Sequence, residues 1–210
     1  MLARVAELRD LGLFPLDLVL LPGERLPLHL FEPRYRQLYA DCVLGDLPFV
    51  LIRAESGETA RVGCAARFEE LVQRSDDGRL HVVVRGVEPV EVVEETEGAL
   101  YFSAMCRTLT DAAVTPDPEL QREVRERFRR LAERVAGAPR EPEAPAGVPL
   151  SYAVGGAVEL HPGVAQGLLE TRDENARLGE VRDALDAMLA VAERATMAAA
   201  RAKTNGRVPH

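Results

Sequence analysis

The chain has 210 residues, of which 47% are hydrophobic and 29% are charged, and its net charge is -8. This composition excludes a disordered chain and is sufficient for one large domain or two small ones. An acidic chain has no general attraction to nucleic acid or to anionic membranes. No apolar run approaches the roughly 18 residues of a membrane helix, and the first ten residues lack the order of a signal peptide. We therefore expect a cytoplasmic protein that does not enter a membrane.

Cysteine and histidine are too scattered to indicate a metal site. The three cysteines are far apart and lie in apolar runs: Cys42, Cys64 and Cys106. Without a CxxC pair, they are predicted to be buried free thiols. The four histidines do not lie at helical or hairpin spacing: His29, His81, His161 and His210. A metal site would need long-range convergence, so we expect no metal and no cofactor.

The first hundred residues are rich in short apolar runs typical of strands. The expected strands lie at 12–21, 26–31, 48–54, 60–73, 79–94 and 99–109. Between the second and third, residues 32–44 have the apolar spacing of one helix, and Pro33 suits its first turn. About six strands with a single helix predict a small closed or half-open barrel.

Three local patterns refine this β region. Asp77-Gly78 between apolar runs predicts a hairpin with a type I′ turn, whose two central residues have positive φ. Gly86 and Pro89 inside a long strand predict a bulge or bend. The acidic run between Glu88 and Glu97 is interpreted as a solvated strand edge that discourages aggregation.

The character of the chain changes near residue 115. Residues 117–136 predict an amphipathic helix with a regularly spaced apolar face: Leu120, Val124, Phe128, Leu131 and Val135. Its other face is rich in arginine, and Glu123–Arg127 and Glu126–Arg130 have the spacing of helical ion pairs. We interpret this face as solvated and internally paired, because no aromatic residues interleave with the arginines as in an RNA-binding surface.

The last third of the chain predicts further helices. A proline-rich loop at 137–149 precedes short helices at 150–160 and 162–170. Thr171 and Glu174 have the spacing of a capping box that opens a long helix ending near Lys203. We therefore divide the chain into a barrel at 1–115, a helical bundle at 116–203 and a disordered tail at 204–210.

Several catalytic machineries lack their residues. Lys203, the single lysine, lies near the C-terminus without the glycines of a P-loop before it. A Ser–Lys peptidase needs a buried lysine beside its serine, and no GxSxG motif is present. Glu32 or Asp77 could act as an acid or base, but no spacing selects a pair. We expect a protein that is not an enzyme, with a small-molecule-binding protein or an enzyme with a pocket in the barrel as an alternative.

One long motif resembles the N-terminal, substrate-binding domain of Lon proteases. It comprises Leu13-Phe-Pro-Leu16, Val19-Leu-Leu-Pro-Gly23 and Leu26-Pro-Leu-His-Leu-Phe-Glu-Pro-Arg-Tyr35. Weaker matches follow in the same order: Val62-Gly-Cys64, Asp77-Gly78, Gly86, Gln166, Leu168-Leu169-Glu170, Asp173 and Arg177-Leu178. The resemblance covers about residues 12–190. One departure is Glu88-Pro-Val-Glu-Val92, where the family usually has a basic and aromatic pattern.

The resemblance implies a PUA-like β-barrel followed by a helical bundle. The sequence ends before the ATPase and peptidase domains of Lon, so we expect a free-standing, non-catalytic module that binds unfolded or flexible polypeptide segments. It would act as an adaptor or sensor in protein quality control, with a protease or a chaperone as a candidate partner. The candidate groove residues are Phe14, Leu21, Phe31, Tyr35 and Phe68. RNA binding by analogy with PUA-type barrels is a further alternative, which the acidic run and the net charge disfavour.

Overall fold

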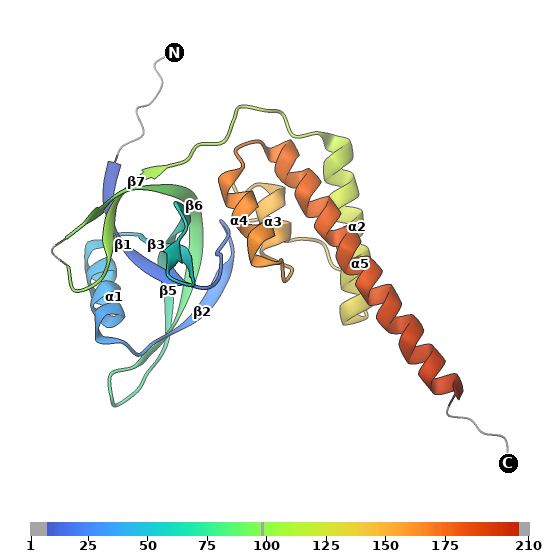
Figure 1. The fold of residues 1–210 in the computed structure, drawn as a ribbon, viewed down its shortest axis with the longest axis horizontal. Coiled ribbons are helices and arrows are strands. Elements are labelled where there is room, and N and C mark those ends of the chain that lie inside the picture. The colour runs from blue at the N-terminus through green and yellow to red at the C-terminus, as the bar shows by residue number, and fades with distance from the viewer. Residues whose placement is uncertain (1–7, 98, 206–210) are drawn as a thin grey trace.

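The computed structural model describes residues 8–97 and 99–205, with side chains as far as residue 198. Strands form a barrel in the first half of the chain, and helices lie beside it in the second half (Figure 1). In chain order the elements are β1 (Leu8–Leu16), β2 (Arg25–Leu30), α1 (Pro33–Gly45), β3 (Phe49–Glu55), β4 (Glu58–Thr59), β5 (Val62–Arg74), β6 (Leu80–Thr96), β7 (Ser103–Thr108), α2 (Pro118–Ala136), α3 (Leu150–Gly155), α4 (Pro162–Glu170) and α5 (Glu174–Asn205). The predicted α+β class, with the strands first and a long helix last, is confirmed.

Five of the strands close into a ring. Neighbouring strands pair in the order β1, β7, β6, β5 and β3, and β3 pairs back to β1. This last pairing is parallel, with Leu13 opposite Val50, whereas the first part of β1 pairs antiparallel with β7. β2 and β4 add to β6 and β3 outside the ring. The described residues form seven strands rather than six because the two-residue β4 folds back on β3.

The acidic run lies on a central strand. β6 pairs with β5 as far as Glu91 and, on its other side, with β2 and then β7, so the predicted strand edge is wrong for Glu91, which has paired strands on both sides. Glu94 and Glu95 pair with β7 alone and are exposed, as predicted for a solvated edge. Arg9 of β1 donates a hydrogen bond to Glu88 at 2.6 Å, and Glu91 forms an ion pair with Arg107 of β7. Pairing with arginines on neighbouring strands therefore accommodates these two carboxylates.

The bulge predicted in β6 is confirmed. Two consecutive residues of β5 face Gly86 and Glu88, so Val87 is the extra residue. A bulge bends its strand. Here the bend brings Gly86 against the turn that precedes β2, where Gly23 N–H donates to the Gly86 carbonyl at 2.9 Å and Gly86 N–H donates to the Glu24 carbonyl at 3.0 Å. The two backbones touch, which leaves no room for a side chain at position 86.

The hairpin between β5 and β6 differs from the predicted type I′ turn. Gly78 has a φ of 81°, but Asp77 does not have a positive φ. Ser75 N–H donates to the Arg79 carbonyl at 2.9 Å, and Gly78 N–H donates to the Ser75 carbonyl at 2.9 Å. The loop therefore spans three residues, a type I turn followed by a left-handed glycine. The prediction assumed a two-residue loop, which the sequence does not require.

The corner between α4 and α5 corrects the predicted capping box. Asp173, not Thr171, caps α5, because its carboxylate accepts hydrogen bonds from the backbone of Asn175 at 2.8 Å and Ala176 at 3.1 Å. Glu174 is thereby free to point into the protein. The helix continues to Asn205, so residues 204 and 205 are helical, and the rest of the predicted disordered tail, 206–210, lies outside the described residues.

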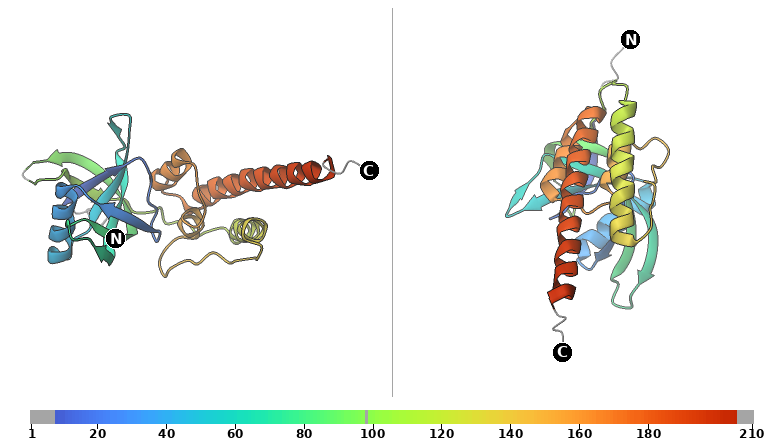
Figure 2. Two further views of the ribbon diagram at one scale, coloured as in Figure 1. Left: turned by 90° about the horizontal axis from the view of Figure 1, so that it is seen from below. Right: turned by 90° about the vertical axis from the view of Figure 1, so that its right-hand side faces the viewer.

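The helices α2 and α5 run side by side in the same direction. Three contacts follow in the same order along both helices: Asp117 with Asn175, Arg127 with Asp186, and Arg134 with Glu193. Figure 2 shows α5 continuing well past the end of α2, away from the barrel. Two parallel neighbours need a long return connection. The chain supplies it with the loop after α2 and with α3 and α4.

One apolar core crosses the boundary expected near residue 115. The same cluster of buried side chains contains Phe14 and Leu21 from the barrel region and Leu168 and Leu178 from the helices. The contact is close, since a Cβ atom at Gly155 would lie 2.8 Å from a methyl carbon of Leu21. The barrel and the helices differ in secondary structure but share their hydrophobic interior.

The three cysteines are free and buried, as predicted. Burial raises the pKa of Cys42 and Cys106 to about 11 and that of Cys64 to about 12. At pH 8 about one thiol in a thousand or fewer is ionised, and the thiolate is the reactive form. We therefore expect DTNB to label the native protein very slowly and to label all three thiols rapidly in guanidinium chloride. Fast labelling of the native protein would contradict this burial.

Candidate functional site

The five residues predicted as a groove do not form one surface. Phe14, Leu21 and Tyr35 are buried, with exposed fractions of 4%, 2% and 6%. Phe14 stacks on Tyr35 with ring centroids 4.1 Å apart. The half-buried Phe68 packs against the same core through Phe49. Three of the five candidates are therefore core residues that a bound molecule could not reach without rearrangement: Phe14 from β1, Leu21 from the turn before β2 and Tyr35 from α1.

Phe31 is 60% exposed and lies in an aromatic row on the outside of the barrel. His29 lies next to it, and the pairing of β2 with β6 places His29 opposite His81, with their rings stacked 4.3 Å apart. Strands distant in sequence thus bring these two histidines together, although their spacing along the chain does not indicate it. Across the described residues, no three His, Cys, Asp or Glu side chains gather in a way that could hold a metal ion.

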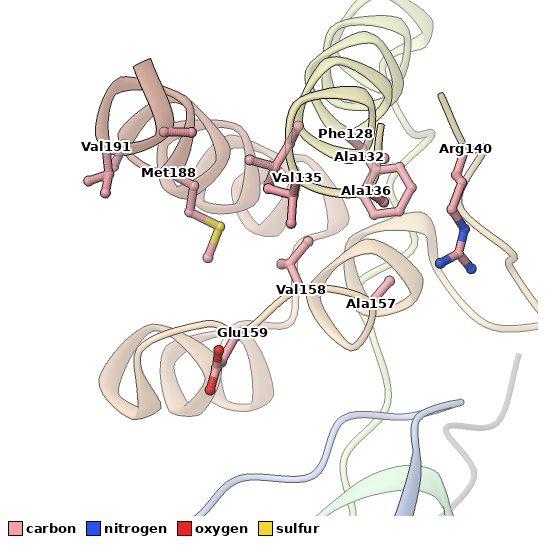
Figure 3. Close-up of a pocket in the computed structure, with 13 residues that line it drawn as sticks. Phe128, Ala132, Val135, Ala136, Arg140, Ala157, Val158, Glu159, Met188 and Val191 are labelled. Carbon is pink, nitrogen blue, oxygen red and sulfur yellow. The ribbon is translucent and has the colours of Figure 1, made fainter. Parts of the chain in front are cut away.

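An apolar groove of about 640 Å³ lies between α2, α5 and the connection from α3 to α4 (Figure 3). Its lining is Phe128, Leu131, Ala132, Val135, Ala136, Arg140, Ala157, Val158, Glu159, Ala187, Met188, Val191 and Ala192. We call this set the α2–α5 groove. Eleven of these thirteen residues are apolar, and ligand sites are typically concave with mostly apolar linings. The groove is therefore the best candidate site on the described surface.

The groove exists because each long helix has more apolar surface than its neighbours cover. On α2, Val124 is fully buried and Leu131 nearly so, but Val135 near the helix end is 75% exposed. On α5, Leu185 and Leu189 are buried while Val191, on a different face, is 58% exposed. Figure 3 shows Val135 and Val158 between the two helices and the connection below them. Isolated exposed apolar residues are ordinary, but a contiguous concave set marks an interaction site.

Surface ion pairs hold the two walls of the groove. Arg127 of α2 donates to Asp186 of α5 at 2.8 Å, and Arg134 lies 3.6 Å from Glu193. Glu123–Arg127 also pairs within α2 at 3.6 Å, as predicted. Glu126, however, pairs with Arg129 instead of the predicted Arg130. The paired interpretation of the arginine-rich face thus holds for several of its arginines.

A buried charge network positions α5 against the rest of the chain. The Arg177 side chain has no solvent exposure and donates hydrogen bonds to Glu174 at 2.8 Å and to Asp111 at 2.8 Å. Its guanidinium lies 4.4 Å from the ring centroid of Tyr152. Burial by itself lowers the pKa of Arg177, but the bonds to the two carboxylates outweigh it and the pKa is raised. Arg177 is therefore charged and links the segment after β7 to the helices.

The carboxylates considered as acid or base are engaged elsewhere. Glu32 lies 2.7 Å from Arg34 in an ion pair. The hydrogen bond from the Arg79 side chain lowers the pKa of Asp77 below its ordinary value. A second cavity, of about 220 Å³ between barrel and helices, is lined by Glu88 and Asp111 among others, and both are ion-paired to arginine. No pair of free, converging carboxylates is present in these places.

Comparison with known proteins identifies the family. The model of the ATP-dependent protease La (LON) substrate-binding domain matches residues 10–187. The Lon N-terminal domain protein from Xanthomonas campestris is similar in structure, with 25% sequence identity and a TM-score of 0.64 over 82% of this chain and 96% of that chain. The N-terminal domain of the Mycobacterium avium complex Lon protease has the same fold, with 18% identity and a TM-score of 0.62 over 85% of this chain and 98% of that one. No curated protein matches the chain.

Within the described residues, no helix has the length and apolar character needed to cross a membrane. The match to the family model includes the strand barrel and the helices as far as the middle of α5. It contains both the long N-terminal motif and the buried Arg177. Since the family model spans most of the sequence, the chain belongs to the family of Lon substrate-binding domains.

Proposed function

We propose that this protein recognises polypeptide segments without transforming them, and that the α2–α5 groove receives their apolar side chains. The observation that carries the proposal is the concave apolar lining in which Val135 and Val191 remain largely exposed. Helix-lined apolar grooves commonly bind segments whose side chains they remove from water. The family is defined by substrate binding, which agrees with such a role.

The wider role is that of an adaptor or sensor in cytoplasmic protein quality control. Unfolded or flexible polypeptides expose apolar segments that folded proteins bury, and a shallow groove of this kind would distinguish the two. A protease or a chaperone is the partner to which such a module would deliver its ligand. Phe31, the most exposed of the residues predicted from the sequence, is retained as a second candidate contact.

Replacing Val135 with aspartate is expected to weaken binding of a reduced, permanently unfolded α-lactalbumin by about tenfold or more. Covering a valine side chain contributes about 1.5 kcal/mol or more, and a factor of ten corresponds to about 1.4 kcal/mol. An aspartate there also places a charge that the bound segment would have to desolvate. Fluorescence anisotropy with labelled α-lactalbumin measures the dissociation constant.

The matched control is Val72→Asp. Val72 is 59% exposed on β5, outside the groove, and the change in charge and size is identical. We expect its dissociation constant to stay within twofold of the parent protein. Equal weakening by both variants, or no binding of the unfolded protein at all, would reject the groove as the recognition site.

A further inference from the structure

The α2–α5 groove carries one charge of each sign at opposite ends, and neither is paired with a side chain in the described part of the chain. Figure 3 shows Arg140 beside Ala157 and Phe128 at one end, and Glu159 near Met188 at the other. Both side chains are exposed, and neither forms an ion pair with a residue whose side chain the structure describes. From this charge complementarity, and resting on the proposed function, we infer that the groove selects apolar segments flanked by an acidic residue on one side and a basic residue on the other.

Arg140 and Glu159 have no ion-pair partner among the described side chains, whereas two arginines on α2 are paired. Arg127 and Arg134 are engaged by carboxylates of α5, so they are unavailable to a ligand. Arg140 instead follows the end of α2, where Gly137 terminates the helix with a φ of 76°. Arg140 and Glu159 are the two charged residues in the described lining of the groove, and both lie in segments that connect helices.

The backbone segments that carry Arg140 and Glu159 are restrained by contacts before and after each residue. Beyond Arg140, the chain is anchored at Pro142, which is buried although its neighbours are exposed. Beside Glu159, Val158 lines the groove, and Leu160 N–H donates to the Val158 carbonyl at 3.1 Å. His161 then caps α4 by accepting a hydrogen bond from Gly163 N–H at 3.2 Å. A charge on a restrained backbone loses less conformational freedom when it pairs with a ligand.

Apolar contact and charge contribute differently to such a site. The apolar lining supplies affinity for almost any hydrophobic segment, whereas exposed charges at its ends discriminate between segments. A solvent-exposed ion pair changes a dissociation constant by at most about fivefold. Reversing one end, from attraction to repulsion, can therefore shift a preference by about tenfold or more. The end charges therefore determine which segment is preferred, and the apolar lining supplies the affinity.

The test uses synthetic peptides that share one leucine- and phenylalanine-rich centre. The first carries glutamate at one end and lysine at the other, the second carries lysine at both ends, and the third carries glutamate at both ends. Relative to the parent protein, Arg140→Glu should shift the preference from the mixed peptide to the lysine peptide by about tenfold. Glu159→Arg should shift it toward the glutamate peptide, and the double variant should prefer the mixed peptide again.

Controls separate local pairing from net charge. Arg125→Glu and Glu180→Arg change the net charge equally, and both residues are exposed and outside the groove. If these controls shift the preference as much as the groove variants do, the inference is overturned while groove binding stands. If no peptide binds, or if Val135→Asp leaves binding unchanged, the proposed function fails as well. A concentration-dependent dimer that Val135→Asp dissociates and that competes with the peptides would assign the groove to a second copy, and would overturn the inference.

Discussion

Replacing Arg177 with methionine is expected to lower the free energy of unfolding by about 3–5 kcal/mol. The arginine is fully buried, and Glu174, which it neutralises, is only 7% exposed. Removing one partner of a buried ion pair leaves the other charge uncompensated in a poorly solvated position. Asp111, Ser151 and the Thr171 carbonyl would also lose a hydrogen-bond donor. Urea unfolding followed by circular dichroism gives the free energy, provided that the slope with denaturant is unchanged.

Arg182→Met provides the matched control on the same helix. Arg182 pairs with Asp183 at 2.9 Å and lies 3.9 Å from Glu123, but its side chain is 36% exposed, and ion pairs that are open to solvent contribute little to stability. We expect the urea midpoint of this variant to stay close to that of the parent protein. Equal midpoints for the two variants would show that the Arg177 network does not hold the helices against the barrel region.

Replacing Gly86 with alanine is expected to lower the free energy of unfolding by about 3 kcal/mol, near the upper end for overpacking. A Cβ atom at this position would lie 2.2 Å from the Leu21 carbonyl oxygen and 3.1 Å from the Cys64 sulfur. The obstacle is backbone, so no rotation of a side chain can relieve it. Relief requires breaking the hydrogen bonds between Gly86 and the turn before β2. Thermal and urea unfolding of the variant measure the loss.

Gly179→Ala is a control for which the free energy of unfolding is expected to change in the opposite direction. An added Cβ at Gly179 meets nothing within 4 Å, and the residue lies inside α5. Alanine there should raise the free energy of unfolding by about 0.5–1 kcal/mol, because glycine loses more backbone entropy in a helix. If both alanines changed stability in the same direction, the close approach at Gly86 would not be the reason for its glycine.

Expectations from the sequence succeeded where one element decides the outcome. The helical spacing of α2 and the glycine and proline in β6 predicted an amphipathic helix and a bulge, and both are present. The expectations failed where the packing of a neighbouring element decides the local structure. The Asp77-Gly78 hairpin has a three-residue loop because the flanking register of β5 and β6 sets its length. The capping box at Thr171 gave way to Asp173, since Glu174 is engaged by the buried Arg177.

The residues of the candidate site also divide into those that a sequence pattern indicates and those that only packing places. The sequence identified Val135 as part of an apolar stripe on α2, but the stripe alone implies that it is buried. It is exposed because α5, some sixty residues away in sequence, packs along the face of α2 that carries Val124 and Leu131 and leaves the groove side of α2, with Val135, uncovered. Arg140 and Glu159 carried no sequence signal, since they lie in connecting segments without periodicity.

The amino-acid sequence is sufficient to predict the α+β class, the order of strands and helices, the family motif in the first strands and the burial of the three cysteines. Each of these depends on residue spacing or composition within a short segment. Three features become apparent in the folded chain alone: which aromatic residues are core, that His29 and His81 meet, and where apolar surface remains uncovered. The difference arises because periodicity defines the face that an element tends to bury, whereas the packing of distant elements determines how much of that face is covered.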